Sequence, residues 1–254
     1  MGILSGKTAI VTGASAGIGY ATARLFAAEG ANVVAVARGS DRLHALADEI
    51  GAAGGKAAVL AGDVSDERVA RQAVELAVER FGGLDIAFNN AGTLGAMGSV
   101  TDIDAAAWHD TIDTNLSSAF FSAKYQIPAM LARSQGSLIF TSSFVGHTIG
   151  MPGMAAYGAG KAGLVGLART LAVEYAAHGI RVNVLMPGGT DTEMGRAAAP
   201  TAEARSFVES LHPVKRLAQP AEIAGAVLFL ASDAASFVTG TTLFADGGVS
   251  MSKT

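Results

Sequence analysis

Thr12-Gly13-Ala14-Ser15-Ala16-Gly17-Ile18-Gly19 joins an apolar run, Thr8–Val11, to a stretch with helical spacing, Ile18–Glu29. A glycine-rich turn between a short apolar strand and a helix is typical of the first βαβ unit of a doubly wound α/β fold. Its three glycines allow the backbone to approach a pyrophosphate, and the amino terminus of the following helix favours the negative charge. The spacing is GxxxGxG rather than GxGxxG, and such turns also arise from packing alone, so the turn needs support from the rest of the chain.

The rest of the chain repeats the order of strand and helix. Apolar runs predict strands at Thr8–Val11, Asn32–Ala37, Ala57–Leu60, Leu84–Phe88, Ser137–Phe140, Arg181–Leu185 and Thr241–Phe244. Helical spacing predicts helices at Ile18–Glu29, Ser40–Ile50, Ser65–Phe81 (with Ser65 as N-cap), Ala105–Arg133, Ala155–His178 and Ala221–Ala231. The sequence therefore predicts one Rossmann-type α/β domain over residues 1–254, with a doubly wound parallel sheet of about seven strands and helices on both faces. The irregular segment 187–213 is expected to form a lid over a substrate site.

Composition excludes several classes of protein and of site. Half of the 254 residues are hydrophobic, 16% are charged and the formal net charge is −4, which excludes a disordered chain and, without a basic run, nucleic-acid binding. The absence of cysteine excludes disulfides, thiolate catalysis and cysteine-held metals. The five histidines are scattered, so no metal site is expected.

No segment predicts a membrane span. The longest stretch without Asp, Glu, Lys or Arg, Ser134 to Gly160, contains Pro152, several glycines and many hydroxyl groups, so it does not read as one apolar helix. The beginning of the chain has no signal-peptide pattern. We therefore expect no membrane partner and a cytoplasmic location.

The end of the second predicted strand indicates which dinucleotide is bound. An NAD site places Asp or Glu there to accept a hydrogen bond from the ribose 2′-hydroxyl. Here Ala37 holds that position, Arg38 follows, and Ser40 could add a hydroxyl donor. A guanidinium suits a 2′-phosphate, so NADP(H) is favoured over NAD(H); the alternative is a solvated arginine at a strand end.

Tyr157 and Lys161 lie four residues apart on a predicted helix, and therefore on one face. A free phenol titrates near 10 and is a poor acid–base group at neutral pH. A neighbouring ammonium stabilises the phenolate and lowers the phenol pKa toward the working range. In isolation this spacing is common, and most such pairs are a surface Tyr and Lys.

The order of several motifs makes a stronger case. TGxxxGxG is followed by Asn89-Asn90-Ala91-Gly92, Asn115, Ser143, Tyr157-xxx-Lys161 and Pro187-Gly188. Together these motifs resemble the classical short-chain dehydrogenase/reductase family, and the resemblance runs from about Gly6 to Val249.

The resemblance implies roles for individual residues. Tyr157 would be the general acid–base group, Lys161 would bind the nicotinamide ribose and lower the Tyr157 pKa, Ser143 would hydrogen-bond the substrate oxygen, and Asn115 would anchor a water of a proton relay. The cofactor positions that the motifs and the resemblance imply are Gly13, Ser15, Ala16, Gly17, Ile18, Gly19, Arg38, Ser40, Asp63, Val64, Asn89, Ala91, Gly92, Tyr157, Lys161, Pro187, Gly188, Thr190 and Thr192.

Two features depart from the family pattern. Ser143 lies fourteen positions before Tyr157, one more than usual, and Ser142 is the alternative serine; we favour Ser143 because Phe144-Val145-Gly146 follows it. Gly189-Thr190 stands where bulky apolar residues are more typical, which leaves the carboxamide end of the pocket undefined. Leu94–Met97, Met154 and Met194 are candidates for an apolar substrate wall.

The function implied is hydride transfer between NADP(H) and a ketone or secondary alcohol, a small-molecule substrate. The runner-up is reduction of a 3-oxoacyl group on an acyl carrier protein. An alternative of another class is a non-catalytic dinucleotide-binding sensor or scaffold, which would not need the four candidate catalytic residues. The resemblance also implies a homotetramer.

Overall fold

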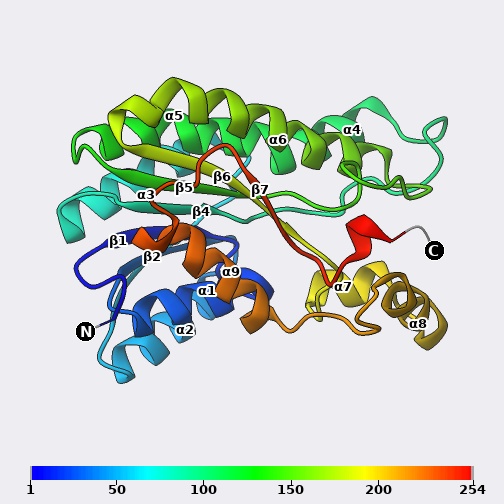
Figure 1. Cartoon of the computed structure of the whole chain (residues 1–254), viewed down its shortest axis with the longest axis horizontal. Helices are drawn as coiled ribbons and strands as arrows, with labels where there is room; N and C mark the ends of the chain where they lie inside the picture. Colours follow the sequence, from blue (N-terminus) through cyan, green and yellow to red (C-terminus); the bar gives the residue numbers. More distant parts are fainter. Residues whose placement is uncertain (1, 253–254) are drawn as a thin grey trace.

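Seven parallel strands form one sheet in the computed structural model, which describes residues 2–252 (Figure 1). Met1, Lys253 and Thr254, which the expected domain includes, lie outside the described residues. The strands are β1 (Thr8–Thr12), β2 (Asn32–Ala37), β3 (Lys56–Ala61), β4 (Ile86–Asn89), β5 (Gly136–Thr141), β6 (Ile180–Pro187) and β7 (Thr242–Ala245). Their order across the sheet is β3-β2-β1-β4-β5-β6-β7, which confirms the predicted Rossmann-type arrangement.

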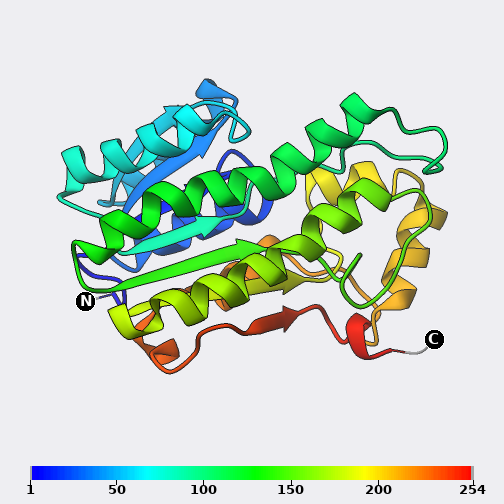
Figure 2. The same cartoon turned by 90° about the horizontal axis from the view of Figure 1, so that it is seen from above.

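Helices cover both faces of this sheet, as expected. Figure 1 shows α5 and α6 on one face and α1, α2 and α9 on the other, and Figure 2 shows the first of these layers from above. The helices are α1 (Gly17–Ala28), α2 (Ser40–Ala52), α3 (Glu67–Phe81), α4 (Ala105–Ile112), α5 (Ser118–Leu131), α6 (Ala155–Tyr175), α7 (Glu193–Ala198), α8 (Ala202–Leu211) and α9 (Pro220–Ala231). Because both sides of the sheet are buried in two apolar clusters, the central strands are continuous runs of Val, Ile, Leu, Phe and Ala.

The turn after β1 is shaped by the absence of side chains. Gly13 has φ +67°, in the left-handed region that favours glycine. A Cβ on Gly19 would lie 2.2 Å from the Gly13 carbonyl oxygen. Gly19 therefore lets the first turn of α1 pack directly on the loop.

Two helix boundaries differ from the sequence prediction. The expected single helix Ala105–Arg133 is divided into α4 and α5 by a π-helical segment, Asp113–Ser117. The N-cap of α3 is Asp66, whose carboxylate accepts the Arg68 N–H, whereas Ser65 was expected to cap it. Asp66 provides the stronger, charged acceptor one residue later.

The carboxyl ends of the strands position the functional residues. The strand order reverses between β1, which is followed by β2 on one side, and β4 on the other. In open α/β sheets, ligands bind in the crevice outside the carboxyl ends of the strands at such a reversal. The short helices α7 and α8 extend beyond these strand ends (Figure 1).

Candidate active site

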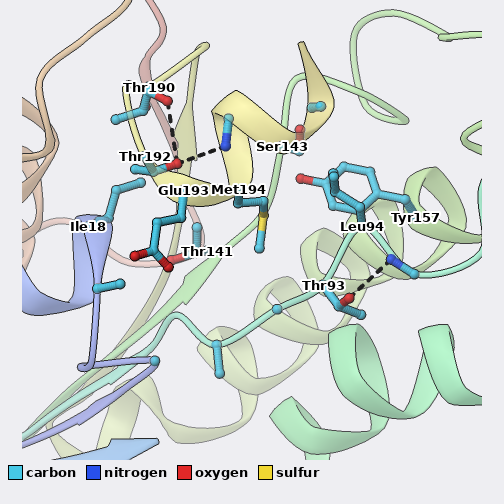
Figure 3. Close-up of a pocket in the computed structure, with 18 of the residues that line it drawn as sticks. Ile18, Thr93, Leu94, Thr141, Ser143, Tyr157, Thr190, Thr192, Glu193 and Met194 are labelled. Carbon is cyan, nitrogen blue, oxygen red and sulfur yellow. Dashed lines mark hydrogen bonds between the residues drawn. The ribbon is translucent and has the colours of Figure 1, made fainter. Parts of the chain in front are cut away.

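A cavity of about 1240 Å³ lies at the carboxyl ends of the strands. Its lining includes the glycine-rich turn, the ends of β2, β5 and β6, the loop after β4, the first turns of α6, and residues of α7 and α8. Figure 3 shows Ser143, Tyr157 and Leu94 grouped at one end, Ile18 at the other, and Met194 between them. The cavity is therefore long enough to join the dinucleotide motif to the Tyr–Lys motif.

The glycine-rich turn lines one side of this cavity through Gly13, Ser15, Ala16, Gly17 and Ile18. A Cβ on Gly17 would lie 2.9 Å from Thr192 Cγ2, so the open space at this turn depends on its missing side chain. The α1 amino terminus faces the same space. This cradle fits the pyrophosphate of a dinucleotide.

Hydrogen bonds join the start of the loop that follows β4 to the last residue of β1. The Thr12 hydroxyl oxygen accepts the Asn90 and Ala91 N–H groups at 2.9 and 3.0 Å, and Asn90 Nδ2 donates to the Thr12 carbonyl at 3.1 Å. Ala91 and Gly92 line the cavity together with Asn90, a residue that the sequence analysis did not select. Its place in the Asn-Asn-Ala-Gly motif was the available signal.

Asn89 was expected to line the cofactor and does not lie in the cavity lining. Its side chain is buried, donates to Gln126 Oε1 at 2.8 Å and accepts from Gln126 Nε2 at 3.1 Å. Asn89 is the last residue of β4, and neighbouring residues of a strand point to opposite faces. Gly19 likewise lies behind the loop rather than in the lining.

The end of β2 forms another side of the cavity. Ala37, Arg38, Asp63 and Val64 line it, so no carboxylate stands at the end of β2. The Asp63 carboxylate accepts hydrogen bonds from the Ser65 N–H and hydroxyl, which lower its pKa, and Arg38 adds a smaller effect in the same direction. Ser40 does not belong to the lining, and its hydroxyl lies 3.2 Å from an Asp41 carboxylate oxygen.

Arg42, which the sequence analysis did not select, also lines this side. Its Nη1 lies 2.9 and 3.0 Å from the two carboxylate oxygens of Glu193, which also lines the cavity. The pair joins α2 to α7. Both side chains are largely exposed, so the pair contributes little to stability.

Tyr157 and Lys161 lie in the first turns of α6 and are both buried. Figure 3 shows the phenol oxygen of Tyr157 directed into the cavity on the side of Ser143. Burial raises the pKa of Tyr157, and hydrogen bonding by Ser143 acts in the opposite direction. The phenol is therefore protonated at neutral pH.

Lys161 is only 4% exposed, and its Nζ donates to the Thr141 carbonyl at 2.9 Å. Burial lowers its pKa to about 8, so the ammonium form still predominates at pH 7. The pKa rise of Tyr157 comes from burial, and the Lys161 ammonium is not among the groups that shift it. The lowering of the phenol pKa by Lys161 stays a prediction of the sequence analysis.

Asn115 lies in the π-helical segment, where its side chain is turned to the loop after β4. Its Oδ1 accepts the Thr93 N–H at 3.1 Å and its Nδ2 donates to the Thr93 carbonyl at 2.9 Å. A Cβ on Gly92 would lie 2.9 Å from both Asn115 Oδ1 and Lys161 Nζ. Asn115, Lys161 and Gly92 are therefore brought together, although they are far apart in the chain. π-Helical segments occur frequently at functional sites.

The two neighbouring serines have different surroundings. The Ser142 hydroxyl donates to the Lys161 carbonyl at 2.7 Å, whereas Ser143 Oγ accepts the Val145 N–H at 3.2 Å and faces Tyr157. The geometry thus favours Ser143 as the serine nearest the phenol. A tight turn from Phe144 to Ile149 takes up the longer connection to Tyr157.

The segment after β6 closes the remaining side of the cavity. Pro187, Gly188, Thr190 and Thr192 line it as expected. The Thr190 hydroxyl donates to the Gly188 carbonyl at 3.0 Å, and Thr192 caps α7 by accepting the Gly195 N–H at 3.0 Å (Figure 3).

The end of the cavity near Tyr157 is mainly apolar. The expected wall residues Leu94–Met97, Met154 and Met194 all line it, together with Phe144 and Met151. Arg205, which also lines the cavity, is paired with Glu209 at 3.0 Å and lies 3.7 Å from Asp191. The positive charge of Arg205 is therefore already balanced by the carboxylates of Glu209 and Asp191.

Two further findings concern residues 2–252 as a whole. None of the helices in this range combines the length and apolar character that a membrane crossing requires. In the same range no group of three or more His, Asp or Glu residues is arranged to hold a metal ion.

Comparison with known proteins gives matches over almost the whole chain. The sequence model of the family described as Enoyl-(Acyl carrier protein) reductase matches residues 13–250. Cyclohexanol dehydrogenase of Acinetobacter sp. (strain SE19) is 42% identical over 95% of this chain and 94% of its own length.

Solved structures match equally well. The crystal structure of levodione reductase has a TM-score of 0.94 and 34% identity, covering 98% of this chain and 99% of that one. A structure described as an NAD(P)-dependent gluconate 5-dehydrogenase from Beutenbergia cavernae, with NADP bound at low occupancy, has a TM-score of 0.92 and 37% identity over 98% of both chains. The chain therefore belongs to the short-chain dehydrogenase/reductase family, and is an oxidoreductase that uses a nicotinamide dinucleotide and acts on a hydroxyl or carbonyl group.

Proposed function

We propose that this protein transfers hydride between NADP(H) and a ketone or secondary alcohol, with Tyr157 as the general acid–base group. The observation that carries this proposal is the meeting of Ser143, Tyr157 and Lys161 in the same cavity as the glycine-rich turn. When bound, the nicotinamide supplies or accepts the hydride. The chain itself supplies orientation and a proton.

Each residue has a defined part in ketone reduction. The Ser143 hydroxyl donates a hydrogen bond to the carbonyl oxygen and orients it beside Tyr157. The neutral phenol of Tyr157 then gives its proton to that oxygen as negative charge develops there. The Lys161 ammonium, reached through the space that Gly92 leaves open, binds the nicotinamide ribose and stabilises the phenolate that remains. Asn115 anchors a water that returns a proton.

The preference for NADP(H) is supported by the side chains at the end of β2. Ala37 provides no acceptor for a ribose 2′-hydroxyl, and Arg38 lines the cavity beside Asp63 and Val64. A guanidinium forms paired hydrogen bonds with phosphate. We assign Arg38 to the 2′-phosphate.

The substrate that we propose is an uncharged alicyclic ketone or the matching secondary alcohol. Leu94, Met97, Phe144, Met154 and Met194 contribute apolar surface to the cavity that holds Tyr157. The similarity to cyclohexanol dehydrogenase supports a ring of about this size. Cyclohexanone is accordingly the probe for the experiments below.

Two properties of the whole molecule belong to this proposal. Segment 187–213, which contains α7 and α8, acts as the lid of the substrate end. Exposed apolar side chains at Phe120, Val173 and Phe237 support burial between subunits of a homotetramer.

The function is tested by Tyr157→Phe. The variant keeps the ring but has no proton to give, so kcat for cyclohexanone reduction should fall by about 100- to 10,000-fold. NADPH affinity, measured by fluorescence titration, should stay within a few-fold of the wild type. Tyr175→Phe, at the other end of α6, is the matched control and should retain full activity.

A wild-type rate in Tyr157→Phe would contradict the assigned role. A 3-oxoacyl thioester of pantetheine, run in parallel, separates the proposal from the carrier-protein alternative. Turnover of that thioester without turnover of any simple ketone would replace the proposed substrate class.

Cofactor choice is tested by Ala37→Asp combined with Arg38→Leu. Loss of charge-assisted hydrogen bonds of about 1.5–3 kcal/mol lowers NADPH affinity by roughly ten- to 100-fold. The new carboxylate should raise NADH affinity. The ratio of kcat/KM values for NADPH and NADH measures the change, with exposed Arg80→Leu on α3 as control. An unchanged ratio would show that Arg38 does not contact the cofactor.

Gly92→Ala tests the contact between the β4 loop and the buried lysine. The added methyl group would meet Asn115 Oδ1 and Lys161 Nζ, each 2.9 Å away, and should displace both. We expect a loss of kcat of roughly 100-fold, the usual result of small misplacements of catalytic groups. Gly51→Ala on α2, where no atom lies within 4 Å, is the control and should be neutral. Full activity of Gly92→Ala would contradict the described geometry.

A further inference from the structure

His212 is a buried side chain that the proposed chemistry does not use. It follows α8 directly and is 2% exposed. Its Nδ1 lies 2.7 Å from the Val208 carbonyl oxygen, and its Nε2 lies 2.9 Å from the Gly189 backbone nitrogen. The ring therefore joins the last turn of α8 to the segment after β6.

The two partners determine the protonation of the ring. A backbone carbonyl can only accept a hydrogen bond, so Nδ1 carries the proton toward Val208. A backbone N–H can only donate, so Nε2 presents its lone pair to Gly189. His212 consequently donates at Nδ1 and accepts at Nε2, with both nitrogens satisfied. The bond at Nδ1 also serves one of the final carbonyls of α8, which lack helical partners.

The position of this ring accounts for the unusual Gly188-Gly189 pair. A Cβ on Gly188 would lie 2.8 Å from His212 Nε2, and a Cβ on Gly189 would lie 3.0 Å from His212 Cε1 and 2.8 Å from Leu217 Cδ2. Neither glycine has a positive φ. The glycines are therefore needed for space rather than for backbone conformation.

At Gly189 the two ends of the segment that contains α7 and α8 lie side by side. The Ala218 N–H donates to the Gly189 carbonyl at 2.9 Å, and the Asp191 N–H donates to the Ala218 carbonyl at 2.9 Å. Both backbone groups of Gly189 are thus held, one by Ala218 and the other by His212. Because His212 is itself fixed to α8, a displacement of α8 acts on the Gly189 N–H.

The ring also contacts the catalytic segment. Phe144 meets His212 edge to face, with ring centroids 6.1 Å apart at 77°. Phe144 follows Ser143 and lines the cavity. His212 therefore touches the lid helix, the strand end at the cofactor and the residue next to the candidate catalytic serine.

We propose that His212 is a positioning residue for hydride transfer: its ring fixes the Gly188–Gly189 backbone against the nicotinamide and couples it to the α7–α8 lid. This inference rests on the proposed function, because it assigns the Pro187–Thr192 side of the cavity to the nicotinamide. The bond from the Gly189 N–H to Nε2 carries the effect. The bond to Val208 serves to orient the ring.

Two amide substitutions separate these bonds. In His212→Gln the longer side chain can place an oxygen near the position of Nε2 and accept the Gly189 N–H. In His212→Asn the shorter amide can reach Val208 but not Gly189. The rate of a single turnover of cyclohexanone by each enzyme with NADPH and [4-²H]NADPH reports hydride transfer directly. Affinity for adenosine 2′,5′-bisphosphate, which lacks the nicotinamide, reports the remote part of the site.

We expect His212→Asn to slow hydride transfer by about ten- to 100-fold, with a larger isotope effect, and His212→Gln to remain within about threefold of the wild type. Both variants should bind adenosine 2′,5′-bisphosphate normally and melt near the wild-type temperature. Normal hydride transfer in His212→Asn, or equal losses in both variants, would overturn the proposal. Parallel losses of rate, bisphosphate affinity and melting temperature would also overturn it in favour of a packing role. If the wild type reduced no ketone, the proposed function would fail instead.

Discussion

The site is organised by one buried positive charge. The Lys161 ammonium is buried at the cavity lining, pairs with no carboxylate in residues 2–252, and donates to a single backbone carbonyl, that of Thr141. Removing an unpaired charge from water is costly, which is why burial lowers its pKa to about 8. The surrounding structure must therefore supply oriented dipoles in place of water. The remaining N–H donors of the Lys161 ammonium are free for the ribose of the proposed cofactor.

Several features of the fold can be understood from this constraint. β5 ends at Thr141, so the sheet itself holds the carbonyl that receives the ammonium. α6 carries Tyr157 and Lys161 on one face, and the buried Ser142 hydroxyl secures the helix by donating to the Lys161 carbonyl. The π-helical segment turns Asn115 toward the same place, and Gly92 leaves the space between them. The proposed acid–base group and the buried charge beside it are thus placed by the core rather than by exposed loops.

Features that depend on local sequence were predictable. The strands are buried on both faces and therefore appear as continuous apolar runs, and the glycine-rich turn is specified by its own residues. Helical spacing places Tyr157 and Lys161 on one face, and the order of the other motifs along the chain distinguishes them from an ordinary surface pair.

Features that depend on distant contacts were not predictable. The π-helical segment forms where Asn115 bonds the backbone of Thr93, 22 residues away. Asn89 and Asn90 are adjacent and chemically identical, and only the end of β4 decides which one is buried against Gln126. His212 acquires its role from Gly189, 23 residues earlier, and no local pattern marks it.

The measurement that tests the buried charge most directly is an NMR titration of the cofactor-free protein labelled at lysine Cε and Nζ, with the Lys161 signal assigned by its loss in Lys161→Met. A pKa of about 8 is the predicted result. A value at or above 10.5, the ordinary pKa for lysine, would show that the ammonium is solvated or paired, and would contradict this account of the site.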